Sequence, residues 1–304
     1  MTDIAAGSTV PRRQLGRYLR DLRNAAGITT KAASRELERS EPTIWRIETG
    51  QTSVRALDVK AMCDLYGASS DMTDALMSLA KETKAKGWWQ AYGDAVPEWF
   101  DIFIGLEAAA ARLSTYEAEL VPGLFQTEDY ARTIMRAHSP GASEAEIERR
   151  VQVRMTRQAI VRRPIDPPLL QVAIGEQVVR RPVGNPGVTA AQLDRLTHAS
   201  QLPNVNLRIV PFGAGCHPGL LCGSFTILRF PLNGGGIESE PPTVYTDLFT
   251  GALYLDKPHE IAQYTHAFGE IWGAAFDEDV SSEHIRRAAE ELRDERGQSP
   301  RGLA

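Results

Sequence analysis

The sequence predicts two domains: an all-α domain of five helices, followed by an α+β domain with a small, mainly antiparallel sheet. The 304 residues exceed what one hydrophobic core usually organises. Apolar residues recur at helical spacing up to residue 86, whereas short strand-like segments bounded by Gly and Pro follow Pro164. With 42% hydrophobic and 24% charged residues, the composition excludes a disordered, collagen-like or disulfide-rich chain.

The five helices are expected in residues 1–86. The first carries Leu15, Leu19, Leu22 and Ala26 at helical spacing and ends at Gly27. The others are expected at 30–37, between Ser40 and Gly50, at 55–66 and at 72–86. Together they predict a compact helical domain.

Two of these helices are short and separated by three residues. Thr29 or Thr30 can cap the first, and Ser40 can cap the second, whose first turn holds Glu41 and Pro42. An acid suits the positive end of a helix, and proline suits a position that needs no N–H. This pattern predicts a helix-turn-helix, whose second helix enters the major groove of DNA.

The charge is unevenly distributed along the chain. The whole sequence carries −5, but residues 1–60 hold eleven basic and seven acidic residues, a net of +4, which leaves −9 for the rest. Such asymmetry suggests that the basic part faces a polyanion. A merely solvated basic face is the alternative.

The segment from Leu15 to Gly50, with RYLRDLRNAAGIT and SEPTIWRIETG, resembles the lambda-repressor-like (XRE-type) DNA-binding domain. It departs from that family at Glu38, where the turn usually holds Gly. Packing at the core or its edge is favoured for Trp45 over a contact with the sugar-phosphate wall. The resemblance implies these DNA-binding residues: Thr29, Thr30, Lys31, Ser40, Glu41, Thr43, Trp45 and Arg46.

The chemistry of these side chains suits duplex DNA. Arg46 can bind guanine O6 and N7, Glu41 can accept from cytosine N4, and Thr43 can meet a base methyl or a phosphate. The N–H groups and charge at 29–31 suit a phosphate. We expect a homodimer that reads half-sites of double-stranded DNA about 34 Å apart, because one such domain buries too little DNA surface.

A Trp-rich helical junction is expected at 87–115, with Trp88, Trp89 and Trp99. No cation lies between Gly87 and Ile102, so a buried junction is favoured over a platform for base stacking. Helices are expected at about 99–114, 127–137 and 143–163, and the arginines of the last helix are interpreted as a solvated face because glutamates accompany them.

The α+β domain is expected at 116–296, followed by a disordered tail at 297–304. Its predicted strands lie at 169–174, 205–211, 224–230, 243–247 and 252–255. Its later helices are expected at 189–201, which Thr189 would open, and at 258–276 and 281–296.

Residues 88–291 resemble the C-terminal domain of unknown function found behind XRE-type domains in a large actinobacterial family, with WhiJ-like regulators and antitoxin-like members. The motifs are YEAELVPGLFQTEDYAR, RRPVG, QLPNVNLRIVPFGAGCHPGLLCGSFTIL and TVYTD. The resemblance implies a transcription regulator whose second domain senses a small-molecule ligand or binds a small protein encoded nearby. The alternative is an antitoxin-like interaction module that acts mainly through a hetero-complex and reads little specific DNA sequence.

Polar residues near predicted strand ends are the candidates for binding a ligand or partner. Arg180 or Arg181 would receive an acidic group, and His217 stands out as a loop histidine. We predict no enzyme, because no nucleophile or acid–base pair has an evident positioned partner. The full candidate set is Glu176, Arg180, Arg181, His217, Tyr245 and Asp247.

The sequence predicts a cytoplasmic protein with no membrane span, metal or cofactor. The longest uncharged run, 209–228, contains four Gly and two Pro, and the N-terminus lacks the apolar core of a signal peptide. Three cysteines fit a reducing compartment. Cys216, His217 and Cys222 lack a fourth ligand at zinc spacing, so buried thiols are favoured.

Overall fold

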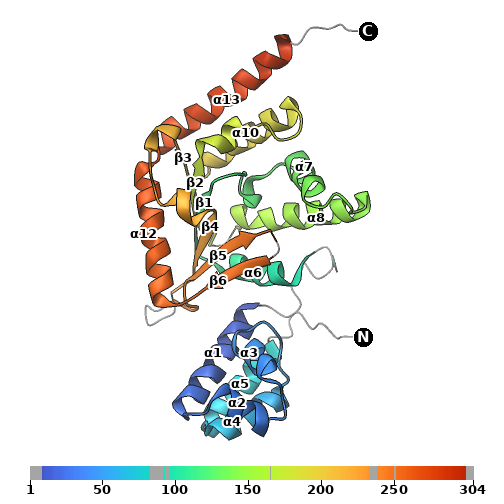
Figure 1. The fold of residues 1–304 in the computed structure, drawn as a ribbon, viewed down its shortest axis with the longest axis vertical. Coiled ribbons are helices and arrows are strands. Elements are labelled where there is room, and N and C mark those ends of the chain that lie inside the picture. The colour runs from blue at the N-terminus through green and yellow to red at the C-terminus, as the bar shows by residue number, and fades with distance from the viewer. Residues whose placement is uncertain are drawn as a thin grey trace. The chain divides into compact units, whose positions relative to one another are not determined.

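The computed structural model describes residues 9–82, 92, 96–164, 166–232, 238–249 and 251–298. The chain divides into two compact units, residues 1–109 and 110–304, which we describe separately (Figure 1). Trp88 and Trp89 of the predicted junction lie outside the described residues, as do 299–304 of the predicted tail.

The first unit is helical and contains the five predicted helices. They are α1 (Thr9–Ala25), α2 (Thr30–Glu36), α3 (Glu41–Glu48), α4 (Ala56–Tyr66) and α5 (Ser70–Glu82). A further helix, α6 (Glu98–Ala109), packs on α1, and its Asp101 lies 3.4 Å from the guanidinium of Arg12.

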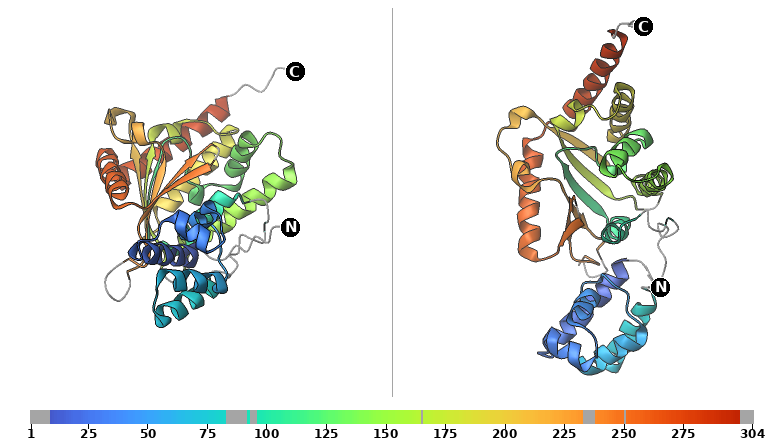
Figure 2. Two further views of the ribbon diagram at one scale, coloured as in Figure 1. Left: turned by 60° about the horizontal axis from the view of Figure 1, so that its bottom comes forward. Right: turned by 45° about the vertical axis from the view of Figure 1, so that its right-hand side comes forward.

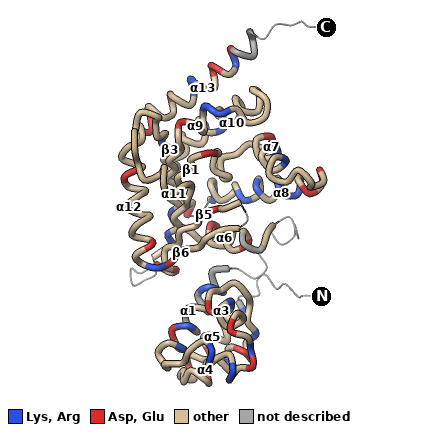
Figure 3. Tube along the Cα trace, in the orientation of Figure 1, with Lys and Arg blue, Asp and Glu red and all other residues tan. Residues whose placement is uncertain are grey.

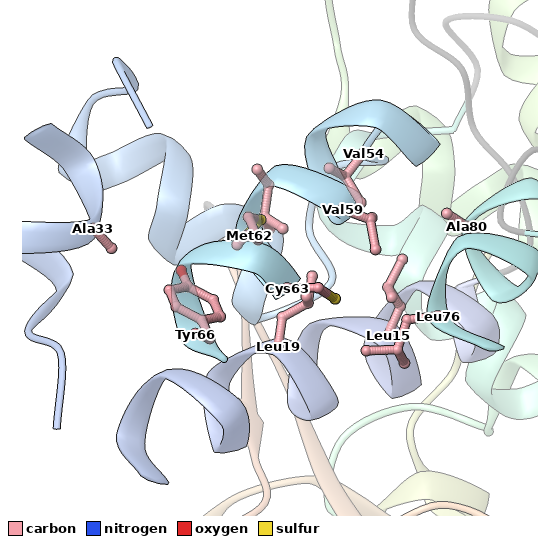
Figure 4. Packing of buried hydrophobic residues seen from close by; sticks show 11 residues of the cluster. Leu15, Leu19, Ala33, Val54, Val59, Met62, Cys63, Tyr66, Leu76 and Ala80 are labelled. Atoms are coloured by element: carbon pink, nitrogen blue, oxygen red, sulfur yellow. The ribbon is translucent and has the colours of Figure 1, made fainter. Parts of the chain in front are cut away.

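The core of the first unit lies between α1, α4 and α5 (Figure 4). Cys63 belongs to this core, and burial raises the pKa of its thiol, so it packs as a small apolar side chain. The predicted buried thiol is therefore present at this position. The fully buried members include Leu15, Leu19, Val59, Met62, Cys63, Leu76 and Ala80.

Gly16 allows α1 to approach the last turn of α3 closely. A Cβ atom at this position would lie 2.5 Å from the carbonyl oxygen of Ile47 and 2.8 Å from that of Glu48. Both oxygens belong to the backbone and cannot move aside as a flexible side chain can. Glycine in the middle of α1 thus sets the distance between the two helices.

The turn between α2 and α3 places Glu38 at φ +51°, in the left-handed region. This is the position where the resembling family has Gly. The turn is held by two bonds between Ser34 and Arg39: the amide of Arg39 donates to the carbonyl of Ser34 at 3.0 Å, and the Ser34 hydroxyl donates to the carbonyl of Arg39. Glu38 therefore accepts a strained conformation imposed by the turn.

The second unit contains a mixed sheet of six strands in the order β3-β2-β1-β4-β5-β6. Strands β1 to β3 are parallel, whereas β4 to β6 run antiparallel to their neighbours. The prediction of a small, mainly antiparallel sheet was therefore wrong. The strands are β1 (Arg112–Glu117), β2 (Leu169–Gly175), β3 (Val205–Val210), β4 (Phe225–Arg229), β5 (Thr243–Leu248) and β6 (Gly251–Leu255).

The prediction missed β1, a central strand of the sheet. An alanine-rich helical run precedes it, and the expected helix was extended to residue 114, but α6 ends at Ala109. Thr115 lies opposite Val172 of β2 and Thr226 of β4. Pairing on both sides overrides the local helix preference.

Helical crossovers explain the parallel half of the sheet. The chain returns from β1 to β2 and from β2 to β3 through helices, and such crossovers leave the joined strands parallel. Asn185 caps the last of these helices, whereas Thr189, the predicted cap, bonds to Val183. The crossover helices are α7 (Glu128–His138), α8 (Glu144–Arg157), α9 (Glu176–Arg180) and α10 (Pro186–Ser200).

Helices cover both faces of the sheet. The helix α12 (Pro258–Ala274) packs on one face through an apolar cluster that includes Tyr116, Phe225 and Phe268. The helices α7, α8 and α10 lie on the other side (Figure 2). The last helix, α13 (Glu278–Gln298), packs along α10 and β3 and includes the first two residues of the predicted tail.

Within the described part of the chain, no helix combines the length and apolarity needed to cross a membrane.

Replacing Glu38 by Gly should stabilise the first unit by up to about 1 kcal/mol. The change relieves the left-handed strain, and the greater freedom of Gly in the unfolded chain offsets part of the gain. Hydrogen exchange of peptides from α2 and α3 should slow in this variant. As a control, Arg35→Gly, within exposed α2, should speed exchange; slower exchange in both variants would contradict the assignment of strain to Glu38.

Candidate functional site

The helix α3 divides its side chains between the core and solvent. Ile44 and Ile47 are buried, whereas Glu41, Trp45 and Arg46 are exposed. These two buried residues are three positions apart, so they lie on the same side of the helix. The exposed positions form the opposite, outward face of α3. The side chains predicted to meet DNA bases therefore lie on the accessible side of the helix.

Hydrogen bonds order the N-terminal turn of α3. The Ser40 hydroxyl accepts from the amide of Thr43 at 3.3 Å, as predicted for an N-cap, and lies 2.8 Å from the Thr43 hydroxyl. The Arg46 guanidinium donates to the same Thr43 hydroxyl at 3.5 Å. This chain of contacts connects Ser40, Thr43 and Arg46 along the helix.

The first turn of α2 contains the residues predicted to meet a phosphate. The Thr29 hydroxyl caps the helix by accepting from the amide of Ala32 at 3.1 Å. Lys31 is exposed, and Thr30 is half-buried. The Lys31 charge therefore lies at the surface beside the helix start.

Trp45 is 53% exposed, so of the two expected packing positions, in the core or at its edge, the core is excluded. It follows Ile44, which is fully buried, and one residue turns an α-helix by about 100°. Trp45 therefore points away from the core and adds a large apolar surface to the outward face of α3.

Arg39 is a further surface cation, which the sequence reveals only as part of the net charge of residues 1–60. It lies in the turn between α2 and α3, is half exposed, and donates to a carboxylate oxygen of Asp58 at 2.9 Å. Its position between two predicted helices was the sequence signal that could have identified it as a surface cation of the turn.

A buried ion pair connects α1 to the last turn of α3. The Arg23 guanidinium donates to both carboxylate oxygens of Glu48, at 2.6 and 2.8 Å, and also to the carbonyl of Ile28 at 2.9 Å. The two side chains are only 10% and 4% exposed. The hydrogen bond to Glu48 raises the pKa of Arg23, so its guanidinium remains charged.

Replacing Glu48 by Ala should destabilise the first unit by about 3–5 kcal/mol, because it leaves the Arg23 charge buried without its partner. Hydrogen exchange of peptides from α1 and α3 should accelerate strongly. The control is Asp64→Ala, which removes an exposed pair with Lys60 and should cost less than about 1 kcal/mol. Equal effects of the two variants would show that the buried pair does not anchor α3.

The six candidate residues of the second unit do not form one site. Glu176 accepts from the amide of Phe212 at 2.9 Å and from His284 at 3.1 Å, and Arg180 pairs with Glu291 at 2.6 Å. These bonds join α9 to α13 and to the segment after β3. These hydrogen bonds and ion pairs form a network that holds the elements of the fold together.

Arg181 and His217 lie apart from that network. Arg181 pairs with Glu119, and the Nδ1 atom of His217 accepts from the amide of Gly219 at 3.2 Å. The His217 ring lies edge-on to Tyr116, 6.0 Å away, on the face that α12 covers. The structure therefore does not bring His217 together with Tyr245 and Asp247.

Tyr245 and Asp247 belong to a third group, which we call the Arg154 cluster: Glu117, Gln126, Arg154, Tyr245 and Asp247. Burial raises the pKa of Glu117 to about 7, and the charge of Asp247 adds to this shift. Burial also lowers the pKa of Arg154 to about 10, although nearby Asp247 and Glu117 oppose that change. The Arg154 guanidinium donates to the Gln126 side-chain oxygen at 2.6 Å.

The arginines of α8 were expected on a solvated face, which was wrong for Arg157. Arg157 is only 9% exposed, and Arg154 is half-buried. The basic segments of α8 are shown in Figure 3. Helical spacing alone did not reveal this, because β1, whose Glu117 interacts with the charge of Arg154, was not predicted.

Replacing Glu117 by Gln should remove one component of the pH dependence of unfolding. The folded-state pKa of Glu117 is raised above its ordinary 4.5, so the folded protein holds more protons and loses stability as pH rises from about 4.5 to about 7. Urea unfolding of the second unit is monitored by hydrogen exchange at several pH values. It should show this loss of stability only when Glu117 is present. Glu119→Gln, at an exposed neighbouring position, should retain the loss; its persistence in Glu117→Gln would contradict the assignment.

Among the described residues, no group of three or more His, Cys, Asp or Glu is arranged to hold a metal ion. Cys216 is exposed and Cys222 is half-buried, so burial of all three thiols was wrong.

Comparison with protein-family models gives two matches. A helix-turn-helix domain matches residues 14–76, and a domain of unknown function (DUF5753) matches residues 100–287. Searches of curated proteins and of solved structures found no match. The outward face of α3 thus lies within a matched helix-turn-helix domain, and because the second match covers more than half of the chain, the protein belongs to the DUF5753 family.

Proposed function

We propose that the protein is a sequence-specific, DNA-binding transcription regulator of the XRE type, whose second unit senses a ligand or binds a partner protein. The outward face of α3, within the matched helix-turn-helix domain, carries this proposal. The proposal assigns no catalytic activity to the chain and has it work in the cytoplasm, where a bacterial regulator meets the chromosome.

The exposed side chains of α3 suit reading of the major groove. Arg46 would bind guanine O6 and N7 in a bidentate pair, and Glu41 would accept from cytosine N4. Trp45, exposed beside them, would pack on a base methyl or on the sugar-phosphate wall. Lys31 would contribute a phosphate contact that orients the helix without reading sequence.

Two copies of the chain would bind DNA together as a dimer. One helix-turn-helix domain buries too little DNA for regulatory affinity, and a dimer would read half-sites about 34 Å apart. The resemblance to WhiJ-like and antitoxin-like actinobacterial proteins adds a small protein partner as the second possible input. An antitoxin-like module acting mainly through a hetero-complex would instead bind DNA without sequence preference, so DNA selection separates the two.

Arg46→Ala should weaken binding to a selected DNA site about 5- to 150-fold, which corresponds to about 1–3 kcal/mol for a bidentate base contact. The site is obtained by selecting random duplexes with the full-length protein, and affinity is measured by fluorescence anisotropy at fixed salt. Nonspecific affinity should change far less.

The control is Lys60→Ala, which removes an exposed cation from α4. It should leave the preference for the selected site intact. Failure of the full-length protein to enrich any sequence, or an equal loss of preference in the Lys60 variant, would contradict specific reading by α3.

A further inference from the structure

A cavity of about 600 Å³ opens on the second unit, where the antiparallel half of the sheet meets the first turns of α12. This volume lies within the range of small-molecule sites, about 300–1,000 Å³. The six candidate residues of the second unit all lie outside its lining. The lining residues are Arg229, Pro241, Pro242, Asp256, Pro258, Ile261, Ala262, Thr265 and His266.

Three prolines form stiff walls of this cavity. Pro241 and Pro242 come directly before β5, and Pro258 is the first residue of α12. A proline ring fixes φ and removes the N–H donor, so these residues neither extend the strand ladder nor rotate freely. Walls that are already rigid lower the entropy cost of binding a ligand.

Ile261 and Ala262 add apolar surface from α12. Ile261 is buried and belongs to the apolar cluster between α12 and the sheet, whereas Ala262 is exposed. Together with the prolines, they make five of the nine lining residues apolar. An apolar molecule placed here removes its own surface and that of the walls from water, which favours binding.

Arg229 brings hydrogen-bond donors to the cavity. Its Nη1 atom donates to Glu238 at 3.0 Å, and its side chain is 37% exposed. Within the described part of the chain, this is the one hydrogen bond that the guanidinium makes. Because a guanidinium carries several N–H groups, others remain for an acceptor atom of a ligand.

The charges around the cavity favour neither an anion nor a cation. An anion would compete with Glu238 for Arg229 and would lie near Asp256, whereas a cation would lie near Arg229. His266 lies 3.3 Å from Glu270, so a charge on its ring would be balanced there. An ion would also exchange its hydration for apolar walls, which costs free energy. The lining therefore suits an uncharged molecule.

The cavity lies beside the start of the central strand. The backbone carbonyl of Arg229 accepts from the amide of Ala111 at 2.9 Å, and Arg229 lies opposite Arg112, the first residue of β1. Ala111 is the second residue of the second unit. A molecule held by the Arg229 side chain would thus contact the residue that fixes the beginning of β1, a position that suits a sensing role.

We propose that this cavity binds a small uncharged molecule with an apolar body and a carbonyl group. The body packs on Pro241, Pro242 and Pro258, and the carbonyl oxygen accepts a hydrogen bond from Arg229. The site rests on the ligand-sensing role proposed above and gives that role a position and a chemical class.

Ligand-observed NMR titration of the full-length protein tests the cavity with three probes that share one apolar body and differ in charge. We expect 4-phenylbutanamide, which is neutral and carries a carbonyl group, to bind at millimolar concentration. The 4-phenylbutanoate anion and the 4-phenylbutylammonium cation should bind at least about fivefold more weakly. Absence of amide binding, or an ion that binds as tightly as the amide, would overturn the proposal.

Two substitutions at exposed positions of α12 locate the binding. Ala262→Trp places an indole in the cavity and should weaken amide binding at least about tenfold, because the apolar body loses its space. Gln263→Trp, at the next exposed position and outside the lining, should bind as the unaltered protein does. Unchanged binding in Ala262→Trp, or an equal loss in both variants, would contradict the site.

Arg229→Met removes the donors but keeps a long side chain. It should weaken amide binding at least about fivefold, the loss expected for one hydrogen bond. The matched control is Arg180→Met, which also loses an ion pair, with Glu291, at a similar exposure of 40%, but lies on α9 outside the lining. Binding by Arg229→Met as tight as that of the control would overturn the assigned chemical class.

Thermal unfolding confirms that each variant is folded. No DNA is present in these measurements, so their failure leaves DNA reading by α3 intact. Failure of DNA selection, in turn, leaves the probe titrations valid.

Discussion

The buried pair between Arg23 and Glu48 is the contact on which the position of the outward face of α3 depends. An ion pair taken out of water is expensive unless its geometry is good, and this one is bidentate, with a third bond to the carbonyl of Ile28. It fixes the end of α3 against α1 where Gly16 brings the two backbones together. The outward side chains of α3 thus project from a helix whose C-terminal end is fixed against α1.

A corresponding constraint in the second unit is the position of β1. It pairs with β2 on one side and with β4 on the other, so it joins the parallel half of the sheet to the antiparallel half. The same strand contributes Thr115 and Glu117 to one face of the sheet. Polar side chains in a central strand stay stable here because partners on β4 and α8 satisfy them.

Local signals predicted the helical unit well. The caps at Thr29 and Ser40 each accept the expected backbone bond, because capping involves residues only two or three apart. Predictions that needed distant partners were less accurate: β1 was joined to a helix, and Trp45, expected at the core or its edge, is exposed. The six candidate residues of the second unit were grouped by residue type, but the structure places only Glu176 beside Arg180, and Tyr245 with Asp247 beside Arg154.

The sequence by itself determined the helix-turn-helix, its caps, the accessible residues Glu41 and Arg46, and five of the six strands, because periodicity and capping depend on near neighbours in the chain. Only the tertiary structure decided that Arg23 meets Glu48, that the sheet is mixed, and that the charges of Arg154 and Glu117 interact. Those contacts join residues 25 and 37 positions apart or pair whole strands. Their energies depend on burial and on partners that no local pattern specifies.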